Sequence, residues 1–207
     1  YDYSRAGNPT RANLETNLAS LEGGTGAVAF SSGMSAITSV VQMLNSGDHI
    51  IFTSNVYGGT YRLMESIMNR FGLESSWVDT GDIQSVKDAI KSNTKMIFIE
   101  TPTNPMMTLS DIGALSNLAH DNKCLLIVDN TFMSPYCQRP FEYGADLVVH
   151  STTKYLSGHS DVIGGVVVVR DDEIEEKLKF LQMSVGAVPG PFDCWLTQRS
   201  LKTLGIR

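Results

Sequence analysis

The sequence predicts an α/β fold in which helices flank a mostly parallel sheet. Short apolar runs alternate with segments of helical periodicity from one end of the chain to the other. Strand–helix alternation of this kind is typical of a parallel sheet that is covered on both faces. The 207 residues, 42% of them hydrophobic, suit one α/β domain better than two.

The first half of the chain alternates regularly. We expect strands at 27–30, 49–53, around 77–78 and at 96–99. The expected helices carry apolar faces over 14–21, 37–44, 61–71, 83–90 and 112–119, the last capped by Ser110 or Asp111. Each strand in this half is therefore followed by a helix.

The order changes in the second half. Strands are expected at 124–129, 146–151 and 162–169, joined by loops too short for ordinary helical crossovers, and helices near 172–184 and 193–204 close the chain. Asp129, Ser151 and Lys154 lie at or just past strand ends. Ligands of open α/β sheets bind beyond the carboxyl ends of strands, so this position favours a functional role.

Composition excludes several classes of protein. A net charge of -6 and no basic block argue against nucleic-acid binding, and the longest apolar run is too short to span a bilayer. The three cysteines lack CxxC spacing, which favours a reducing, cytoplasmic compartment. The four histidines form no metal-binding motif. The chain starts at Tyr1 without a visible signal peptide, which we interpret as a piece of a longer chain.

Lys154 and Asp129 together predict a particular chemistry. Lys154 follows two hydroxyl residues at a strand end, where it can act as a nucleophile for Schiff-base formation. Asp129 can pair with a ring nitrogen, and the two groups are what a pyridoxal phosphate site requires. Taken singly, they also fit a loop lysine and a strand-capping aspartate.

Three further segments supply parts of such a site. Gly33 and Met34 start a helix after a strand, where backbone amides favour a phosphate, although such turns are often only tight connections. Tyr57, on a glycine turn, can stack on a planar cofactor or simply be a partly buried aromatic. Asn104 lies between two prolines that either aim it inward or end the strand.

These segments resemble the γ-family of pyridoxal-phosphate transsulfuration enzymes, which includes cystathionine γ-lyase, cystathionine γ-synthase, methionine γ-lyase and O-acetylhomoserine sulfhydrylase. The matching motifs are spread over nearly the whole chain, at residues 3–10, 32–34, 56–60, 100–105, 128–132 and 151–161. The resemblance implies the large domain of fold type I, the aspartate-aminotransferase-like fold. It implies an N-terminal segment 1–25 that contributes to a neighbouring subunit's site, a cofactor domain 26–207, and a C-terminal small domain outside this chain.

The resemblance also implies a role for each site residue. Lys154 holds the cofactor and shuttles protons, Asp129 keeps the ring nitrogen protonated, and Tyr57 stacks on the ring and assists proton transfer at the γ leaving group. The remaining expected contacts are to the phosphate, from Gly33, Met34, Ser151 and Thr153, and to the ring, from Asn104 and Thr131. No metal is expected.

Tyr3 and Arg5 match an element that reaches the phosphate bound by a neighbouring subunit. A guanidinium suits that dianion. The resemblance therefore implies at least a homodimer, and a homotetramer as the family habit. Without the resemblance, Arg5 reads as a surface charge near a terminus.

The resemblance implies an amino-acid substrate and chemistry at its Cγ. Residues 132–136 and 186–189 favour cystathionine γ-lyase, which forms cysteine, 2-oxobutanoate and ammonia, while γ-replacement by cystathionine γ-synthase or O-acetylhomoserine sulfhydrylase is the alternative. Gly59 stands where methionine γ-lyases typically carry a cysteine. The arginine that binds the substrate carboxylate in the family falls outside this chain.

Two other classes remain as remote alternatives. Ser151-x-x-Lys154 matches the signature of acyl-serine enzymes, but Ser151 ends a strand and the companion Ser-Asp-Asn and Lys-Thr-Gly motifs are missing. A non-catalytic paralogue would keep the fold as a binding partner. The intact lysine, aspartate and tyrosine argue against that reading.

Overall fold

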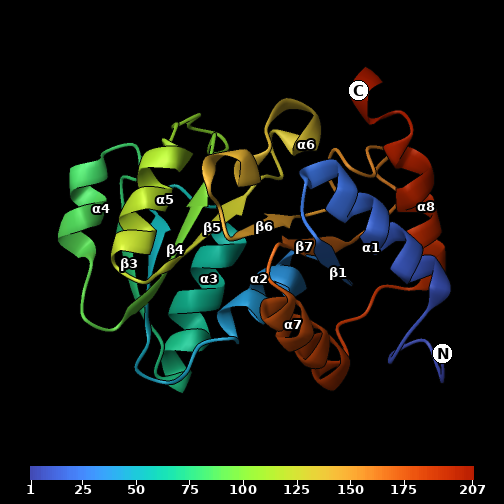
Figure 1. The fold of residues 1–207 in the computed structure, drawn as a ribbon, viewed down its shortest axis with the longest axis horizontal. Coiled ribbons are helices and arrows are strands. Elements are labelled where there is room, and N and C mark those ends of the chain that lie inside the picture. Colours follow the sequence, from blue (N-terminus) through green and yellow to red (C-terminus); the bar gives the residue numbers. More distant parts are fainter.

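A computed structural model describes all residues, 1–207, and is built around one seven-stranded sheet (Figure 1). The strand order is β1-β7-β6-β5-β4-β2-β3. The strands are β1 (Gly26–Phe30), β2 (His49–Thr53), β3 (Glu74–Val78), β4 (Thr94–Glu100), β5 (Leu125–Asp129), β6 (Leu147–His150) and β7 (Gly165–Val169).

Helices flank this sheet, with short 3-10 turns between some of them. The α-helices are α1 (Pro9–Glu22), α2 (Gly33–Val41), α3 (Gly58–Ser66), α4 (Ile83–Ala89), α5 (Ile112–Asp121), α6 (Ser134–Cys137), α7 (Asp172–Val185) and α8 (Pro191–Leu201). The 3-10 turns are η1 (Met68–Phe71), η2 (Pro140–Tyr143) and η3 (Leu204–Ile206).

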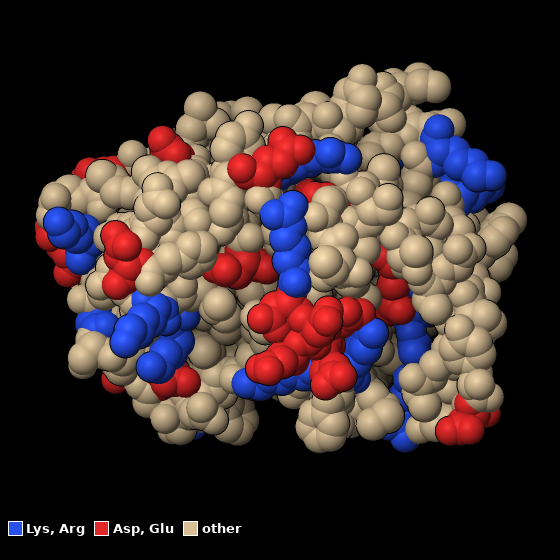
Figure 2. Space-filling model, in the orientation of Figure 1, with Lys and Arg blue, Asp and Glu red and all other residues tan.

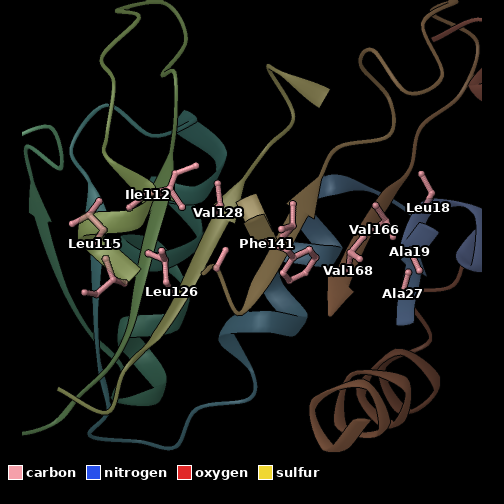
Figure 3. Close-up of a cluster of buried hydrophobic side chains, with 14 of the residues drawn as sticks. Leu18, Ala19, Ala27, Ile112, Leu115, Leu126, Val128, Phe141, Val166 and Val168 are labelled. Carbon is pink, nitrogen blue, oxygen red and sulfur yellow. The ribbon is translucent and has the colours of Figure 1, made fainter. Parts of the chain in front are cut away.

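Side chains alternate between the two faces of each strand and build one apolar core on each side of the sheet. Val166 and Val168 of β7 join the core under α1, α4, α5 and α8, part of which is drawn in Figure 3. Val167 and Val169 join the other core, under α2, α3 and α7. Because both faces of the sheet are covered, the side chains on both faces of each strand are mostly apolar. This explains why the strands appear in the sequence as continuous apolar runs.

The prediction of a mostly parallel sheet is confirmed. Strands β2 to β6 pair in parallel, whereas β7 runs antiparallel to both of its neighbours, β1 and β6. Strand β1 therefore points the same way as β6. As a result, the carboxyl ends of all strands except β7 meet at one edge, which we call the carboxyl edge.

Three details differ from the sequence predictions. The last strand begins at Gly165 rather than at 162, because residues 162–164 pass the carboxyl edge as a loop. The predicted helix 61–71 is divided into α3 and η1 at Ile67. The segment between β5 and β6 contains the short α6 and η2. Of the two predicted caps for α5, Asp111 is the one used, since its carboxylate accepts from the Ala114 amide at 2.9 Å.

The N-terminal helix α1 is part of the packed structure. Helix α1 packs on β1 and α8, with Leu14 and Leu18 in the core, so residues 9–22 belong to the packed part of the chain. None of the helices combines the length and apolar character needed to cross a membrane. Acidic and basic side chains are interspersed on the face shown in Figure 2, with an acidic group near α7, whose first turn holds Asp172, Glu173 and Glu175.

Candidate active site

The carboxyl edge carries a cavity of about 990 Å³ that brings together distant parts of the chain. All of the predicted site residues line it except Tyr3 and Arg5. Those that line it are Gly33, Met34, Tyr57, Asn104, Asp129, Thr131, Ser151, Thr153 and Lys154. The predicted residues that line the cavity therefore converge on one place although they come from five separate segments.

Lys154 lies in the turn that follows β6, and its side chain is exposed to the cavity rather than buried beneath it. The Lys154 ammonium forms no ion pair with any carboxylate of the chain. The backbone of the turn is fixed, since the Lys154 amide donates to Ser151 O at 3.3 Å and the Gly158 amide to Lys154 O at 2.7 Å. An unpaired amine on a fixed backbone can reach an electrophile in the cavity.

Asp129 is the last residue of β5 and is only 7% exposed. Burial raises the pKa of its carboxyl, while hydrogen bonds from Thr131 and the charge of His150 oppose that rise. One oxygen, Oδ1, accepts from the Thr131 amide at 3.0 Å. A buried carboxylate that faces a cavity is stabilised by a cation, because an opposite charge favours its ionised form.

Helix α2 begins at the cavity wall. Ser32 caps it by accepting from the Ser35 amide at 3.0 Å, and the amides of Gly33 and Met34 precede the first intrahelical hydrogen bonds. Gly33 allows a close approach to Ser151, since a Cβ at residue 33 would lie 2.7 Å from Ser151 Cβ. The helix start and the Ser151 hydroxyl thus form a cradle with hydrogen-bond donors for an anion.

Two threonines hold this cradle together. The Thr131 hydroxyl accepts from the Ser151 amide at 2.8 Å, so Thr131 links Asp129 to Ser151. The Thr153 hydroxyl is engaged with the backbone of Gly164, whose amide donates to it at 3.0 Å. The same hydroxyl donates to Gly164 O at 3.3 Å, and a phosphate contact that uses its proton would replace this donated bond while the bond from the Gly164 amide remains.

Tyr57 precedes α3 with 54% of its surface exposed, and its ring lies beside the carboxyl edge. Gly59 makes room for that ring: a Cβ at residue 59 would lie 2.4 Å from Tyr57 Cε1 and 2.7 Å from Met34 Sδ. Asn104 lies in the loop after β4, between two cis prolyl peptide bonds, at Pro102 and Pro105. Both side chains line the cavity.

Tyr3 and Arg5 lie away from the cavity, against the end of α7. The Arg5 guanidinium donates to Met183 O at 2.7 Å and lies 5.1 Å from the centre of the Tyr3 ring. Both residues are exposed. Within a single chain they therefore contribute nothing to the cavity.

The sequence reasoning missed further residues that line the cavity. Glu100 is the most informative of them, since burial and the nearby Asp129 raise its pKa to about 7. Phe132 and Tyr155 form an edge-to-face pair with ring centres 6.3 Å apart. Glu100 ends a strand, as Asp129 does, and this shared position is the signal that would have found it.

Pyridoxal phosphate fits these residues. Its phosphate suits the donors at the start of α2, its protonated ring nitrogen suits the buried Asp129 carboxylate, and its aldehyde suits the unpaired Lys154 amine. No cluster of three or more histidine, cysteine or acidic side chains is arranged to hold a metal. The cavity therefore has the donor set of an organic phosphate cofactor.

Comparison with known proteins agrees with this fit. A family model described as Cys/Met metabolism PLP-dependent enzyme matches residues 1–207. The chain is 54% identical over its whole length to a probable cystathionine γ-synthase of Herpetosiphon aurantiacus and to a cystathionine γ-lyase of Bacillus subtilis. The chain covers 65% of the length of the Herpetosiphon protein and 55% of the length of the Bacillus protein, so it spans between half and two thirds of these relatives.

A solved structure gives the same result for the fold. The crystal structure of metB from Corynebacterium glutamicum superposes on the whole chain with a TM-score of 0.99 at 50% identity, and the chain covers 54% of it. The fold is thus shared with that structure over the whole chain. The chain belongs to the family of Cys/Met metabolism PLP-dependent enzymes.

Proposed function

We propose that the protein containing this chain is a transsulfuration enzyme that acts at Cγ of sulfur amino acids, and that its reaction is that of a cystathionine γ-lyase. Cystathionine would be converted to cysteine, 2-oxobutanoate and ammonia. The convergence of Lys154, Asp129 and Tyr57 on one cavity, beside the start of α2, carries this proposal. Gamma-replacement, as in cystathionine γ-synthase or O-acetylhomoserine sulfhydrylase, is the second candidate, because the relatives include a probable γ-synthase at equal identity.

Pyridoxal phosphate, when bound, supplies an electron sink for negative charge that develops on the substrate. The Lys154 amine would attach the cofactor and, once displaced by the substrate amine, take and return protons at Cα and Cβ. Asp129 would hold the proton on the ring nitrogen, because an adjacent carboxylate favours the cationic ring. The Tyr57 ring would stack on the cofactor and its hydroxyl would hand a proton to the γ leaving group.

The phosphate would be held by the Gly33 and Met34 amides together with Ser151. Thr153 would contribute by donating its hydroxyl proton to the phosphate in place of Gly164 O, and Asn104 would lie near the ring hydroxyl. Thr131 would act through its bonds to Asp129 and Ser151. These contacts would orient the cofactor within reach of the Lys154 amine and of the substrate amine.

The first test replaces the attachment residue in the complete protein. Lys154→Ala should abolish the visible absorption band of lysine-bound cofactor, the pyridoxyl adduct trapped by borohydride, and the formation of 2-oxobutanoate. Lys202→Ala, on an exposed lysine outside the cavity, is the control and should retain all three. A trapped adduct on another residue would contradict the assignment.

Product analysis separates the candidate reactions. With cystathionine as the substrate, 2-oxobutanoate and cysteine support γ-elimination, whereas pyruvate would report cleavage at Cβ. Net synthesis of cystathionine from an O-acylhomoserine and cysteine, at a rate above elimination, would favour the γ-synthase. The wild-type protein with each substrate in turn decides among these outcomes.

We also propose that the site is shared between subunits, with segment 1–25 serving the neighbouring site in a homodimer or homotetramer. The exposure of Tyr3 and Arg5 and their distance from the cavity of their own chain support this assignment. Mixing Arg5→Ala subunits with Lys154→Ala subunits should restore activity, because one mixed site in each dimer regains both side chains. No recovery in mixed assemblies would refute the sharing.

A further inference from the structure

Glu100 joins two segments that border the cavity. It is the last residue of β4, and the residue is 6% exposed. Oε2 accepts from the Tyr57 amide at 2.8 Å, and Oε1 accepts from the Asn104 amide at 3.2 Å. One carboxylate thus receives a backbone hydrogen bond from the start of α3 and another from the loop after β4.

These two bonds are the ones that the Tyr57 and Asn104 amides donate, whereas the neighbouring residues of both segments are bonded elsewhere, as Met107 N is to Thr103 O at 2.8 Å. No side chain caps α3 at Tyr57, whose own ring is half exposed. Glu100 itself is held firmly, since its amide donates to Thr53 Oγ1 at 3.3 Å and it pairs with Asp129 in the sheet register. The rigid strand end can therefore set the position of both loops.

We propose that Glu100 is a positioning residue whose carboxylate clamps the Tyr57 and Asn104 backbones together and so sets where these two side chains face the cofactor. The proposal rests on the proposed function for the identity of the cofactor. The clamp itself is a property of the chain and can be measured without any cofactor.

The clamp requires both oxygens of Glu100 as acceptors. A glutamine amide in its place presents a donor to one of the two backbone N–H groups and loses that bond, whereas protonation of the carboxyl weakens the bond that the protonated oxygen accepts. Because burial and Asp129 raise the pKa of Glu100 to about 7, the clamp is complete above that pH and loosens as pH falls through it. The other charged or titratable groups around the cavity are Lys154, Asp161, Tyr57 and Tyr155.

This electrostatic coupling links the clamp to cofactor binding. The negative charge of Asp129 helps to raise the pKa of Glu100, and a cation beside Asp129 would offset that charge. A protonated ring nitrogen would be such a cation, so binding should favour the ionised Glu100 and tighten the clamp. By reciprocity, a tightened clamp should favour binding.

Hydrogen exchange of the Tyr57 and Asn104 amides in the cofactor-free complete protein tests the clamp. At about pH 8, Glu100→Gln should speed exchange of at least one of these amides by about tenfold, the loss of one bond to a charged group. Glu100→Asp, whose side chain is shorter by one methylene, should not form both hydrogen bonds and should therefore also speed exchange of at least one amide. Glu65→Gln is the matched control, since Glu65 of α3 accepts from Ser75 and Trp77 outside the cavity and should leave both amides unchanged.

The pH dependence of pyridoxal phosphate affinity is the second readout. Affinity of the wild type should fall more steeply from about pH 8 to about pH 6 than that of Glu100→Gln, since only the wild type carries the titrating carboxyl. Unchanged exchange at both amides and parallel pH profiles would overturn the clamp. A wild type that takes up no pyridoxal phosphate, with exchange altered as expected, would overturn the proposed function and not the clamp.

Discussion

The two edges of the sheet both carry buried polar side chains, but only the carboxyl edge holds buried carboxyl groups, Glu100 and Asp129, that form no ion pair within the chain. At the start of β2, His49 is fully buried, with Nδ1 2.8 Å from Thr94 Oγ1 and Nε2 2.9 Å from Ser76 Oγ. At the carboxyl edge, Glu100 and Asp129 lie side by side with raised pKa values and face a cavity that also holds the unpaired Lys154. The amino edge is built for stability, whereas the carboxyl edge retains unpaired charge for a ligand.

A buried pair, Glu22 and His150, has some of its polar atoms bonded and others without a partner. Glu22 of α1 and His150 of β6 are each 1% exposed. Glu22 Oε1 accepts from His150 Nε2 and from Asn130 Nδ2, whereas Glu22 Oε2 and His150 Nδ1 have no partner. This pair ties α1 to the strand that precedes Ser151, so it supports the site without lining it.

The largest stability effect should come from breaking this pair. Glu22→Ala leaves His150 and Asn130 buried without their acceptor, and should lower the free energy of unfolding by roughly 3–5 kcal/mol. Urea unfolding measures the change. The control is Glu142→Ala, whose exposed pair with Arg139 at 3.4 Å should be worth less than about 1 kcal/mol. Equal losses in the two variants would contradict the assignment of a structural role to the buried pair.

An intermediate effect is expected at the glycine turn of the carboxyl edge. Gly59→Ala should displace the Tyr57 ring or Met34, cost about 1–3 kcal/mol in stability, and weaken cofactor uptake. Gly58→Ala is a matched control, since its Cβ would meet nothing closer than Arg62 Nη1 at 3.7 Å. Urea unfolding and cofactor titration on both variants measure the contrast. If they behave alike, close packing of Tyr57 over Gly59 is not what positions the ring.

The smallest effect concerns His49 at the amino edge. Burial lowers the pKa of His49, the charge of Lys91 lowers it further, and Glu74 opposes the change. The unfolded chain therefore binds the proton more readily, so the stability contributed by neutral His49 is complete above about pH 6.5 and is lost as pH falls through the folded pKa.

His49→Gln should cost about 1 kcal/mol near pH 8, because one of the two hydrogen bonds is lost. It should also flatten the dependence of stability on pH below about pH 6.5, since the titrating group is gone. Urea unfolding of both proteins as a function of pH checks these expectations. An equally steep decline in the variant would assign the pH dependence to other groups.

Much of the site could be predicted because strand ends are visible in the sequence. Asp129 follows an apolar run directly, and Lys154 follows another, so their chemistry and their position at the sheet edge could be read together. Glu100 stands at an equivalent position, but its contacts with the Tyr57 and Asn104 amides depend on how two loops fold back. The start of the last strand was misplaced because Val162 and Ile163 continue its apolar pattern while they line the cavity.

The sequence by itself determined the alternation of helices and strands, the burial of both sheet faces and the identity of the reactive groups, because each depends on local periodicity or residue type. The tertiary structure alone decided the strand order, the reversed direction of β7, the pairing of Glu22 with His150 and the contacts of Glu100. These features join residues that are distant in the chain, and no local pattern specifies which distant partner a side chain meets. Local pattern thus indicates the candidate reactive groups, and long-range contacts determine how they are held.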